Sequence, residues 1–269
     1  MINQKIDILG EKINYIFEDN KRPKILFLHG FFSNYKFANE IYNNVNRNFD
    51  IVAFDFPGCG SSSYNNDLTI DFYQKIALAF VEHFQLKNFY IVAHSLGAAS
   101  AVYVASKVSV KKIFLGAPIN YNLINHSAEH AANIKKWLLP TNIEEAIEST
   151  KKLVKNKNNF FEQNIANTAK HFLKLVNLRR NIFQKMLDKE IISQEYLEKN
   201  LKPLYEKVID KCIFANGLED NFVQFDAVYS IAKEFNAPLY PIENCGHAIF
   251  YEQNEKIYNL IQKMVDEKI

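Results

Sequence analysis

The sequence predicts an α/β fold in which flanking helices cover a mostly parallel central sheet, with one helical insertion. Short, continuously apolar segments recur along the chain, as expected for strands that are covered on both faces. Segments with helical spacing of apolar residues separate them, and this alternation favours a parallel sheet with right-handed crossovers. The alternation stops near residue 118 and resumes near residue 208, which indicates an insertion.

Composition restricts the classes of protein to which the chain can belong. Its 269 residues, 48% of them hydrophobic, suffice for one large domain or for a core with an inserted subdomain. The formal net charge of +2 gives no indication of nucleic-acid binding. Three scattered cysteines, Cys59, Cys212 and Cys245, have no zinc-ligand spacing and favour a reducing compartment. We therefore expect a protein without a cofactor or metal.

The apolar segments also bear on localisation. The residues from Met1 to Asp7 contain no apolar signal core, and no later apolar run is long enough to span a bilayer. We expect a cytoplasmic protein whose contact with membranes is at most peripheral.

The N-terminal part of the chain predicts an edge hairpin followed by buried strands. Residues 6–9 and 13–17 alternate apolar and polar side chains and flank a glycine, as in a hairpin. Residues 25–28 form a short apolar strand that ends at His29-Gly30. A helix over about 36–45 leads to a strand over 50–54. The turn that follows contains Pro57, Gly58 and Gly60, and we expect it to be structural.

Regular alternation continues to residue 118. Residues 67–86 predict a helix in which Ile76, Ala79, Phe80 and Phe84 face the sheet. A strand over 89–92 precedes a helix over 96–107, and the next strand ends at 116–118. After the insertion we expect a strand from 211, a helix over 224–235, a strand over 238–241 and a closing helix over 252–267.

The insertion over 118–207 contains helical or irregular patterns only. Helices are expected over 127–139, 143–155, 160–176 and 193–208. The segment holds 15 basic and 10 acidic residues, a net charge of +5, and leaves a net charge of −3 for the rest. A basic insertion favours acidic or lipid-like substrates, although lysines that simply coat exposed helices explain the same composition.

The segment Ala93-His94-Ser95-Leu96-Gly97 lies between the strand over 89–92 and the next helix. It differs at one position from G-x-S-x-G, in which a sharp strand-to-helix turn presents a serine hydroxyl. The helix N-terminus directs its free N–H groups toward any anion that forms there. The pattern makes Ser95 a candidate nucleophile, although a serine at this place also serves as a helix cap.

With these motifs the chain resembles the α/β hydrolases, in particular the lid-bearing esterases, lipases and peptidases. The resemblance spans nearly the full length and divides the chain into a core, 1–117 and 208–269, and a helical lid, 118–207. Ala93 departs from the family, which usually has glycine there, whereas Gly97 is retained. Because alanine is the smallest replacement, we expect the turn to survive with tighter packing.

The order Ser95, acid, His247 is the order of a catalytic triad in this fold. His247 and Asp220 follow predicted strands, so they lie at the same sheet edge as Ser95. The resemblance implies that His247 is the general base and Asp220 the acid, in preference to Glu219 and with Asp226 in reserve.

The resemblance also implies an oxyanion hole, formed by the backbone N–H groups of Phe31 and Leu96. His29 is expected to hold its loop by a side-chain hydrogen bond, and His94 to support packing. The implied activity is that of a serine hydrolase, foremost a carboxylesterase or lipase that acts on a small acyl ester or lipid-like substrate. A thioesterase, an aminopeptidase or a carbon–carbon bond hydrolase would use the same triad.

Two alternatives belong to other classes of protein. His126-Ser-Ala-Glu129-His130 fits the H-x-x-E-H pattern of zinc peptidases, with Glu195 or Glu198 as the further ligand. An α/β-hydrolase scaffold used only for binding is the other, although such a protein usually loses a triad member.

Overall fold

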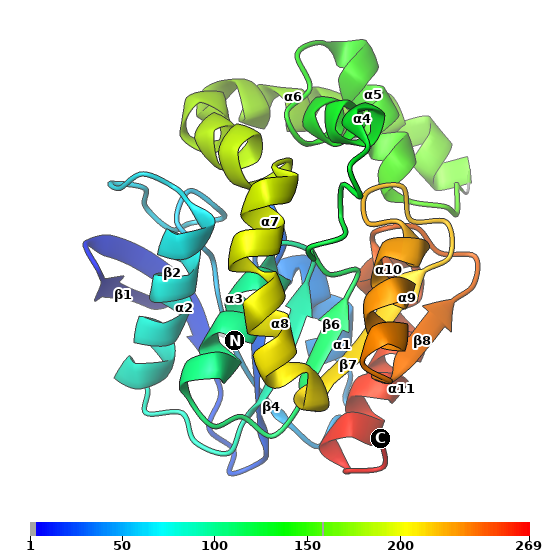
Figure 1. Cartoon of the computed structure of the whole chain (residues 1–269). Coiled ribbons are helices and arrows are strands. Elements are labelled where there is room, and N and C mark those ends of the chain that lie inside the picture. The colour runs from blue at the N-terminus through cyan, green and yellow to red at the C-terminus, as the bar shows by residue number, and fades with distance from the viewer. Residues whose placement is uncertain (1–3, 158) are drawn as a thin grey trace.

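The computed structural model describes residues 4–157 and 159–269, and its centre is an eight-stranded sheet. The strands lie in the order β1-β2-β4-β3-β5-β6-β7-β8 (Figure 1). β1 and β2 pair antiparallel as a hairpin, β2 pairs antiparallel with β4, and all further pairs are parallel. The predicted fold class and the predicted edge hairpin are therefore confirmed. The strands are β1 (Gln4–Ile8), β2 (Glu11–Phe17), β3 (Lys24–Leu28), β4 (Asp50–Phe54), β5 (Tyr90–His94), β6 (Ile113–Gly116), β7 (Cys212–Gly217) and β8 (Leu239–Ile242).

Two hydrophobic layers cover the two faces of the sheet. In β3, Leu26 and Leu28 pack into one layer, whereas Ile25 and Phe27 pack into the other. All four side chains are at most 1% exposed, which explains why the strand is continuously apolar rather than alternating.

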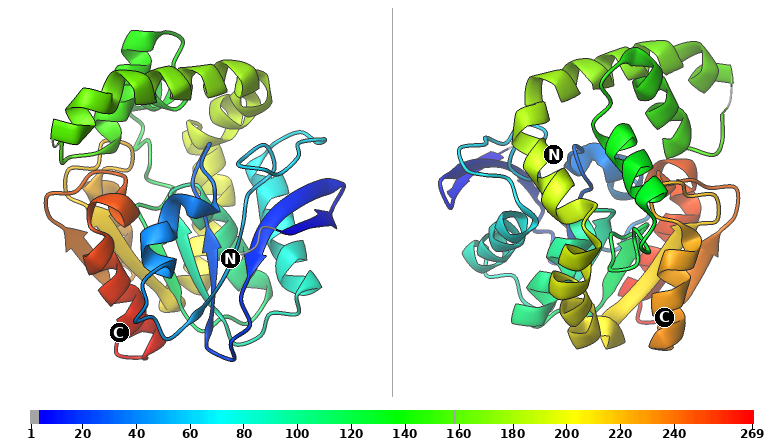
Figure 2. Two further views of the ribbon diagram at one scale, coloured as in Figure 1. Left: turned by 180° about the vertical axis from the view of Figure 1, so that it is seen from behind. Right: turned by 45° about the horizontal axis from the view of Figure 1, so that its top comes forward.

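Helices complete both layers (Figures 1 and 2). One face of the sheet packs against residues of α2 (Ile70–His83), α3 (Gly97–Lys107), α8 (Lys202–Val208) and α9 (Phe225–Glu234). The opposite face packs against residues of α1 (Asn39–Tyr42), α10 (Ile249–Glu252) and α11 (Asn254–Val265). The 3₁₀ turn η1 (Tyr35–Ala38) precedes α1.

Between β6 and β7 all regular elements of the described chain are helices, which begin after an irregular segment over 117–127. The helices α4 (Ala128–Leu138), α5 (Ile143–Leu153) and α6 (Asn159–Met186) form a layer at one end of the sheet, at the top of Figure 1. A short π-helical segment, η2 (Leu187–Ile191), then leads through α7 (Gln194–Asn200), α8 and η3 (Ile209–Lys211) back to the sheet. We call the helices from α4 to η3 the helical insert.

Several predicted helices have different bounds in the structure. The helix predicted over 160–176 continues to Met186, because buried apolar residues recur on one face at Ala169, Val176 and Phe183. The helix predicted over 193–208 is divided at Leu201, and Pro203 lies in the first turn of α8, where it is tolerated. The closing helix predicted over 252–267 corresponds to α11, and a separate short helix, α10, precedes it.

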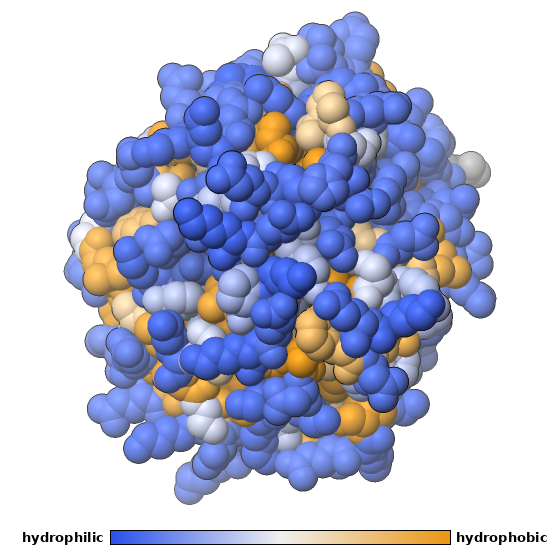
Figure 3. Space-filling view, viewed as in Figure 1, coloured by the Kyte–Doolittle hydropathy of each residue, from blue (hydrophilic) through white to orange (hydrophobic). Residues whose placement is uncertain are grey.

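The surface of the face seen in Figure 3 is mostly hydrophilic, with apolar side chains scattered between charged and polar ones. In the described part of the chain, no helix combines the length and the apolar character that crossing a bilayer requires.

Candidate active site

Ser95 lies in a strained turn between β5 and α3. Its φ of +52° is in the left-handed region, which costs a residue with a Cβ of order 1–3 kcal/mol. The turn is held by a hydrogen bond of 3.0 Å from the Ser95 N–H to the carbonyl of Gly116. A Cβ at Gly97 would lie 2.3 Å from the Leu28 carbonyl oxygen, so this position requires glycine. The Ala93 side chain, by contrast, is accommodated in full burial.

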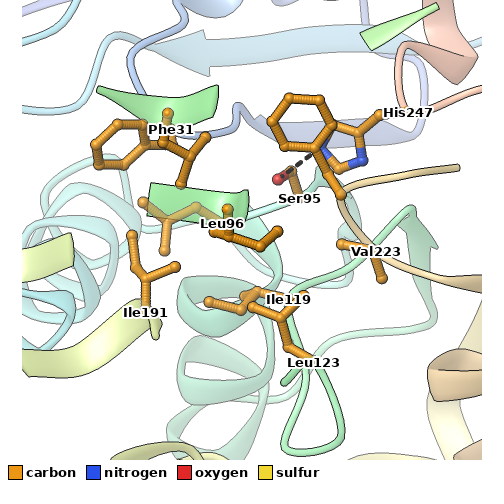
Figure 4. Close-up of a pocket in the computed structure, with 11 residues that line it drawn as sticks. Phe31, Ser95, Leu96, Ile119, Leu123, Ile191, Val223 and His247 are labelled. Carbon is orange, nitrogen blue, oxygen red and sulfur yellow. Dashed lines mark hydrogen bonds between the residues drawn. The ribbon is translucent and has the colours of Figure 1, made fainter. Parts of the chain in front are cut away.

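Three side chains from separate loops form a continuous chain of hydrogen bonds. His247 lies between β8 and α10, and Asp220 follows β7. The Nδ1 atom of His247 is 2.8 Å from Oδ2 of Asp220. Its Nε2 atom is 3.0 Å from the Ser95 Oγ, the bond that Figure 4 shows as a dashed line. The three residues selected from the sequence are thus linked in series, with His247 bonded to both Asp220 and Ser95.

Asp220 is fixed by its own loop. Its Oδ1 atom accepts hydrogen bonds from the N–H groups of Phe222 (2.8 Å) and Val223 (2.9 Å), and its side chain is fully buried. These bonds leave Oδ2 directed at the His247 ring. Glu219 instead accepts from the N–H of Cys245, and Asp226 lies exposed in the first turn of α9.

His247 is held at its ring and at its backbone. The ring stacks on Phe222 at 5.0 Å between centroids. The His247 carbonyl lies 2.9 Å from Nε2 of His94, whose ring stacks on Phe37. Burial and the proximity of His247 lower the pKa of His94 well below its usual value. His94 is therefore neutral near pH 7, and its Nε2–H donates to that carbonyl. The sequence indicated packing for His94 but not this bond.

Phe31 and Leu96 line the same pocket as Ser95 and His247. Within the residues that the structure describes, neither backbone N–H donates to a protein acceptor. Phe31 follows Gly30, at which a Cβ would lie only 3.0 Å from the Ser95 Cβ. His29 holds this loop: its Nε2 accepts from the Phe56 N–H, and its Nδ1 lies 2.8 Å from the Gly30 carbonyl.

The pocket in front of Ser95 is apolar on every side (Figure 4). Ser95 and His247 are its only polar side chains among the described residues. The pocket residues of the helical insert could not be selected from the sequence, because apolar residues on an amphipathic helix are equally typical of ordinary core packing. The apolar lining consists of Phe31, Leu96, Ile119, Leu123, Ile134, Leu138, Ile191, Phe222 and Val223.

Comparison with known sequences identifies the family. The sequence pattern of the family described as alpha/beta hydrolase fold matches residues 23–253. The chain belongs to the α/β-hydrolase family. As in other folds of this kind, the candidate site of this α/β hydrolase lies at the carboxyl ends of the parallel strands.

Relatives with assigned names lie at low identity. This α/β hydrolase is 24% identical to the Mycoplasma pneumoniae protein "Putative esterase/lipase 1", over 92% of this chain and 93% of the relative. It is 27% identical to human monoacylglycerol lipase ABHD6, over 89% of this chain and 74% of the relative. A crystal structure titled as a putative lipase from Acinetobacter baumannii superposes with a TM-score of 0.82 at 18% identity, over 100% of this chain and 93% of that one.

The H-x-x-E-H motif does not form the predicted arrangement in this α/β hydrolase. α4 begins at Ala128, so His126 lies in the preceding turn, with a φ of +57°, and does not share a helix face with His130. His126 is exposed and lies 3.5 Å from Glu198, whereas His130 is buried. Among the described residues, no group of three or more His, Cys, Asp or Glu side chains is arranged to hold a metal ion.

Proposed function

We propose that this α/β hydrolase is a serine hydrolase that cleaves carboxylic esters through an acyl-enzyme, with Ser95 as nucleophile, His247 as general base and Asp220 as the acid. The observation that carries the proposal is the hydrogen-bond chain Asp220–His247–Ser95, which ends at the edge of an apolar pocket. A serine hydroxyl is a weak nucleophile near pH 7, and such a chain is the usual means of activating it.

The geometry supports a definite sequence of proton transfers. Asp220 accepts the Nδ1–H of His247, which leaves Nε2 unprotonated and able to take the Ser95 proton. The Ser95 Oγ then attacks the ester carbonyl, and the imidazolium passes its proton to the leaving alcohol. Water, activated by His247 in the same way, hydrolyses the acyl-enzyme and restores the free serine.

We assign the oxyanion hole to the N–H groups of Phe31 and Leu96. Both border the pocket at Ser95, and neither has a protein acceptor among the described residues. Each is therefore available to an oxygen that becomes negative during attack. Loss of one such donor typically lowers the rate by about 10²–10³-fold.

Two findings favour esters whose acyl part carries no charge over peptides and the substrates of carbon–carbon bond hydrolases. The lining of the pocket has no charged side chain that could bind the ammonium group of a peptide N-terminus or a free carboxylate near the scissile bond. The names of the relatives, esterase/lipase and monoacylglycerol lipase, point the same way. A thioester with the same acyl part remains the second candidate.

We further propose that residues 118–207 act as the substrate-binding lid on a core of 1–117 and 208–269. Five residues of the pocket, Ile119, Leu123, Ile134, Leu138 and Ile191, come from that segment. The acyl part of the substrate would therefore lie between the two parts of the chain.

Hydrolysis of p-nitrophenyl esters of increasing acyl length, by the wild type and by Ser95→Ala, tests the proposed function. We expect hydrolysis that is lost in the variant, and covalent labelling of Ser95 by a serine-directed phosphonate. Equal activity in both proteins would exclude Ser95 as nucleophile. If the wild type neither hydrolyses the esters nor reacts with the phosphonate, the scaffold is better described as a binding protein.

A further inference from the structure

The connection between α5 and α6 runs directly beside the loop that carries His247. The carbonyl oxygen of Leu153 accepts hydrogen bonds from the N–H groups of His247 (3.0 Å) and Ala248 (3.1 Å). Nearby, the side-chain amide of Asn156 donates to the carbonyl of Asn244 at 2.8 Å. We call residues 153–156 the strap. Residues 244–248, which carry His247, we call the base loop. The strap contacts this loop through the Leu153 carbonyl and the Asn156 side chain.

Glu252 joins the strap to the base loop from the other side. Its Oε1 accepts the N–H of Gly246 at 2.8 Å. Its Oε2 accepts the N–H groups of Lys155 (2.6 Å) and Asn156 (3.0 Å). One partly buried carboxylate at the end of α10 thus satisfies three backbone donors, one in the base loop and two in the strap. Hydrogen bonds to a charged acceptor are stronger than those between neutral groups.

Gly246 shows how closely the two segments approach. A Cβ at this position would lie 3.0 Å from the Leu153 carbonyl oxygen, 3.0 Å from the Lys155 nitrogen and 3.1 Å from Glu252 Oε1. The backbone at Gly246 is outside the left-handed region, so no turn geometry demands a glycine here. The tight fit comes instead from the contact with the strap and Glu252, which would have to shift by a few tenths of an ångström to admit a Cβ.

We propose that Glu252 is a positioning residue for the general base, and that it acts by tying the base loop to the strap. The inference rests on the proposed function, in which His247 is that base. The N–H groups of Gly246, His247 and Ala248 all donate to Glu252 or to Leu153. The helical insert thus has a second role besides lining the pocket. It determines the position of the His247 backbone, from which the imidazole reaches the Ser95 Oγ.

The test compares Glu252→Gln and Gly246→Ala with the control Glu255→Gln, which alters an exposed carboxylate on α11. A glutamine of the same size has one acceptor oxygen, and its NH₂ group would face an N–H donor. Gly246→Ala retains the Glu252 carboxylate, but its added methyl group should displace the strap from the base loop. Hydrogen exchange of the amides over 244–250 and 153–157, kcat, KM and the rate of phosphonylation are measured for all four proteins.

For both variants we expect exchange at Gly246, His247 and Ala248 to be at least about tenfold faster. We also expect kcat and the phosphonylation rate to fall by about 10–100-fold, within the contribution of general-base catalysis, with KM changed less than about twofold. The control should match the wild type. A purely structural role would lower the melting temperature and leave kcat and the phosphonylation rate of the folded protein unchanged.

Two results would overturn the inference. Unchanged exchange in Glu252→Gln would mean that the carboxylate does not tie the two segments. Faster exchange with unchanged kcat and phosphonylation would mean that the tie does not position the base. The exchange comparison requires no substrate, so a wild type that fails to hydrolyse esters counts against the proposed function, while exchange still decides whether Glu252 holds the strap.

Discussion

At the scale of single residues, the site depends on side chains whose orientation is each fixed by several contacts. Asp220 has one oxygen bonded to two backbone N–H groups and the other to His247. His247 has ring contacts with Asp220 and Phe222 and a backbone contact with His94. Such redundancy keeps the imidazole oriented before a substrate arrives, which is the condition for efficient general-base catalysis.

Asp220→Asn should retain the fold and lose most activity. The remaining carbonyl oxygen can accept from the Phe222 and Val223 N–H groups, but the variant has no charge to stabilise the imidazolium. We expect kcat for ester hydrolysis to fall by about 10³–10⁴-fold, with thermal unfolding little changed. Asp226→Asn, on an exposed part of α9, is the matched control. Activity in Asp220→Asn close to that of the control would remove Asp220 from the triad.

Buried neutral histidines should make the protein sensitive to acid. Burial lowers the pKa of His94 and of His29 below 6.5 in the folded protein, whereas both return to about 6.5 when unfolded. Below pH 6.5 the unfolded chain takes up protons that the folded chain does not. The free energy of unfolding should therefore be constant above about pH 6.5 and fall as the pH is lowered, by up to ~1.4 kcal/mol per pH unit for each histidine.

Urea unfolding at pH 7.5, 6.5 and 5.5 measures this dependence. His94→Gln can still donate to the His247 carbonyl but does not titrate, so its loss of stability between pH 6.5 and 5.5 should be smaller by ~1 kcal/mol. The comparison of the two proteins cancels the contributions of other titrating groups. Equal slopes would show that His94 is protonated in the folded protein.

At the scale of elements, α6 supports the loop that carries Phe31. Phe183 is fully buried, and its ring lies 5.1 Å from that of Phe31 and 4.8 Å from that of Phe32. Phe32 itself has a φ of +56°, a conformation that neighbouring contacts must maintain. Arg179, on the same helix, donates to the carbonyl of Gly58 at 2.7 Å. The insert thus contacts the loop that carries Phe31 as well as the loop that carries His247.

Phe183→Ala should therefore affect both stability and turnover. We expect the free energy of unfolding to fall by about 3–5 kcal/mol, because a buried aromatic ring is replaced by a cavity. We also expect kcat to fall, because the Phe31 N–H loses its fixed position. Leu178→Ala, at a side chain that is 70% exposed on the same helix, should change neither quantity. A destabilised Phe183→Ala variant with wild-type kcat would show that α6 does not determine the position of the loop that carries Phe31.

The sequence was most informative for strands and strand ends. Continuous apolar runs identify β3 to β7. The motif around Ser95 follows β5, and the motif around His247 follows the short strand β8. Helix bounds in the insert were harder to predict, because α6 extends through the spacing of Ala169, Val176 and Phe183 rather than through any local signal. The strap could not be predicted at all, since its contacts with His247 and Ala248 use the Leu153 carbonyl, a group that every residue has.

At the scale of the whole molecule, the pocket joins two parts of the chain that are distant in sequence. Ile191, in η2, faces the same space as Phe31 and Leu96 of the core (Figure 4). The chain length of the acyl group should therefore be limited by side chains of the insert, whereas the chemistry should depend on the core.

Ile191→Trp tests this separation. The larger ring should fill part of the pocket, so the ratio of kcat/KM for p-nitrophenyl acetate to that for the octanoate should rise by about tenfold or more, as a change of a few methylene groups allows. Leu175→Trp, at an exposed position of α6, is the control. A similar loss for both esters would indicate that the substitution disturbs Ser95 rather than the pocket.

The backbone contacts of the strap also have a consequence for how this protein can change over generations. Because Leu153 binds His247 through its carbonyl, substitutions at 153 that keep the local packing leave that contact intact. Removing or adding one residue within 154–156 would instead shift the backbone N–H groups that reach Glu252 by up to about 3.8 Å. Descendants of this sequence should therefore tolerate drift in the identity of the strap residues more readily than a change in its length.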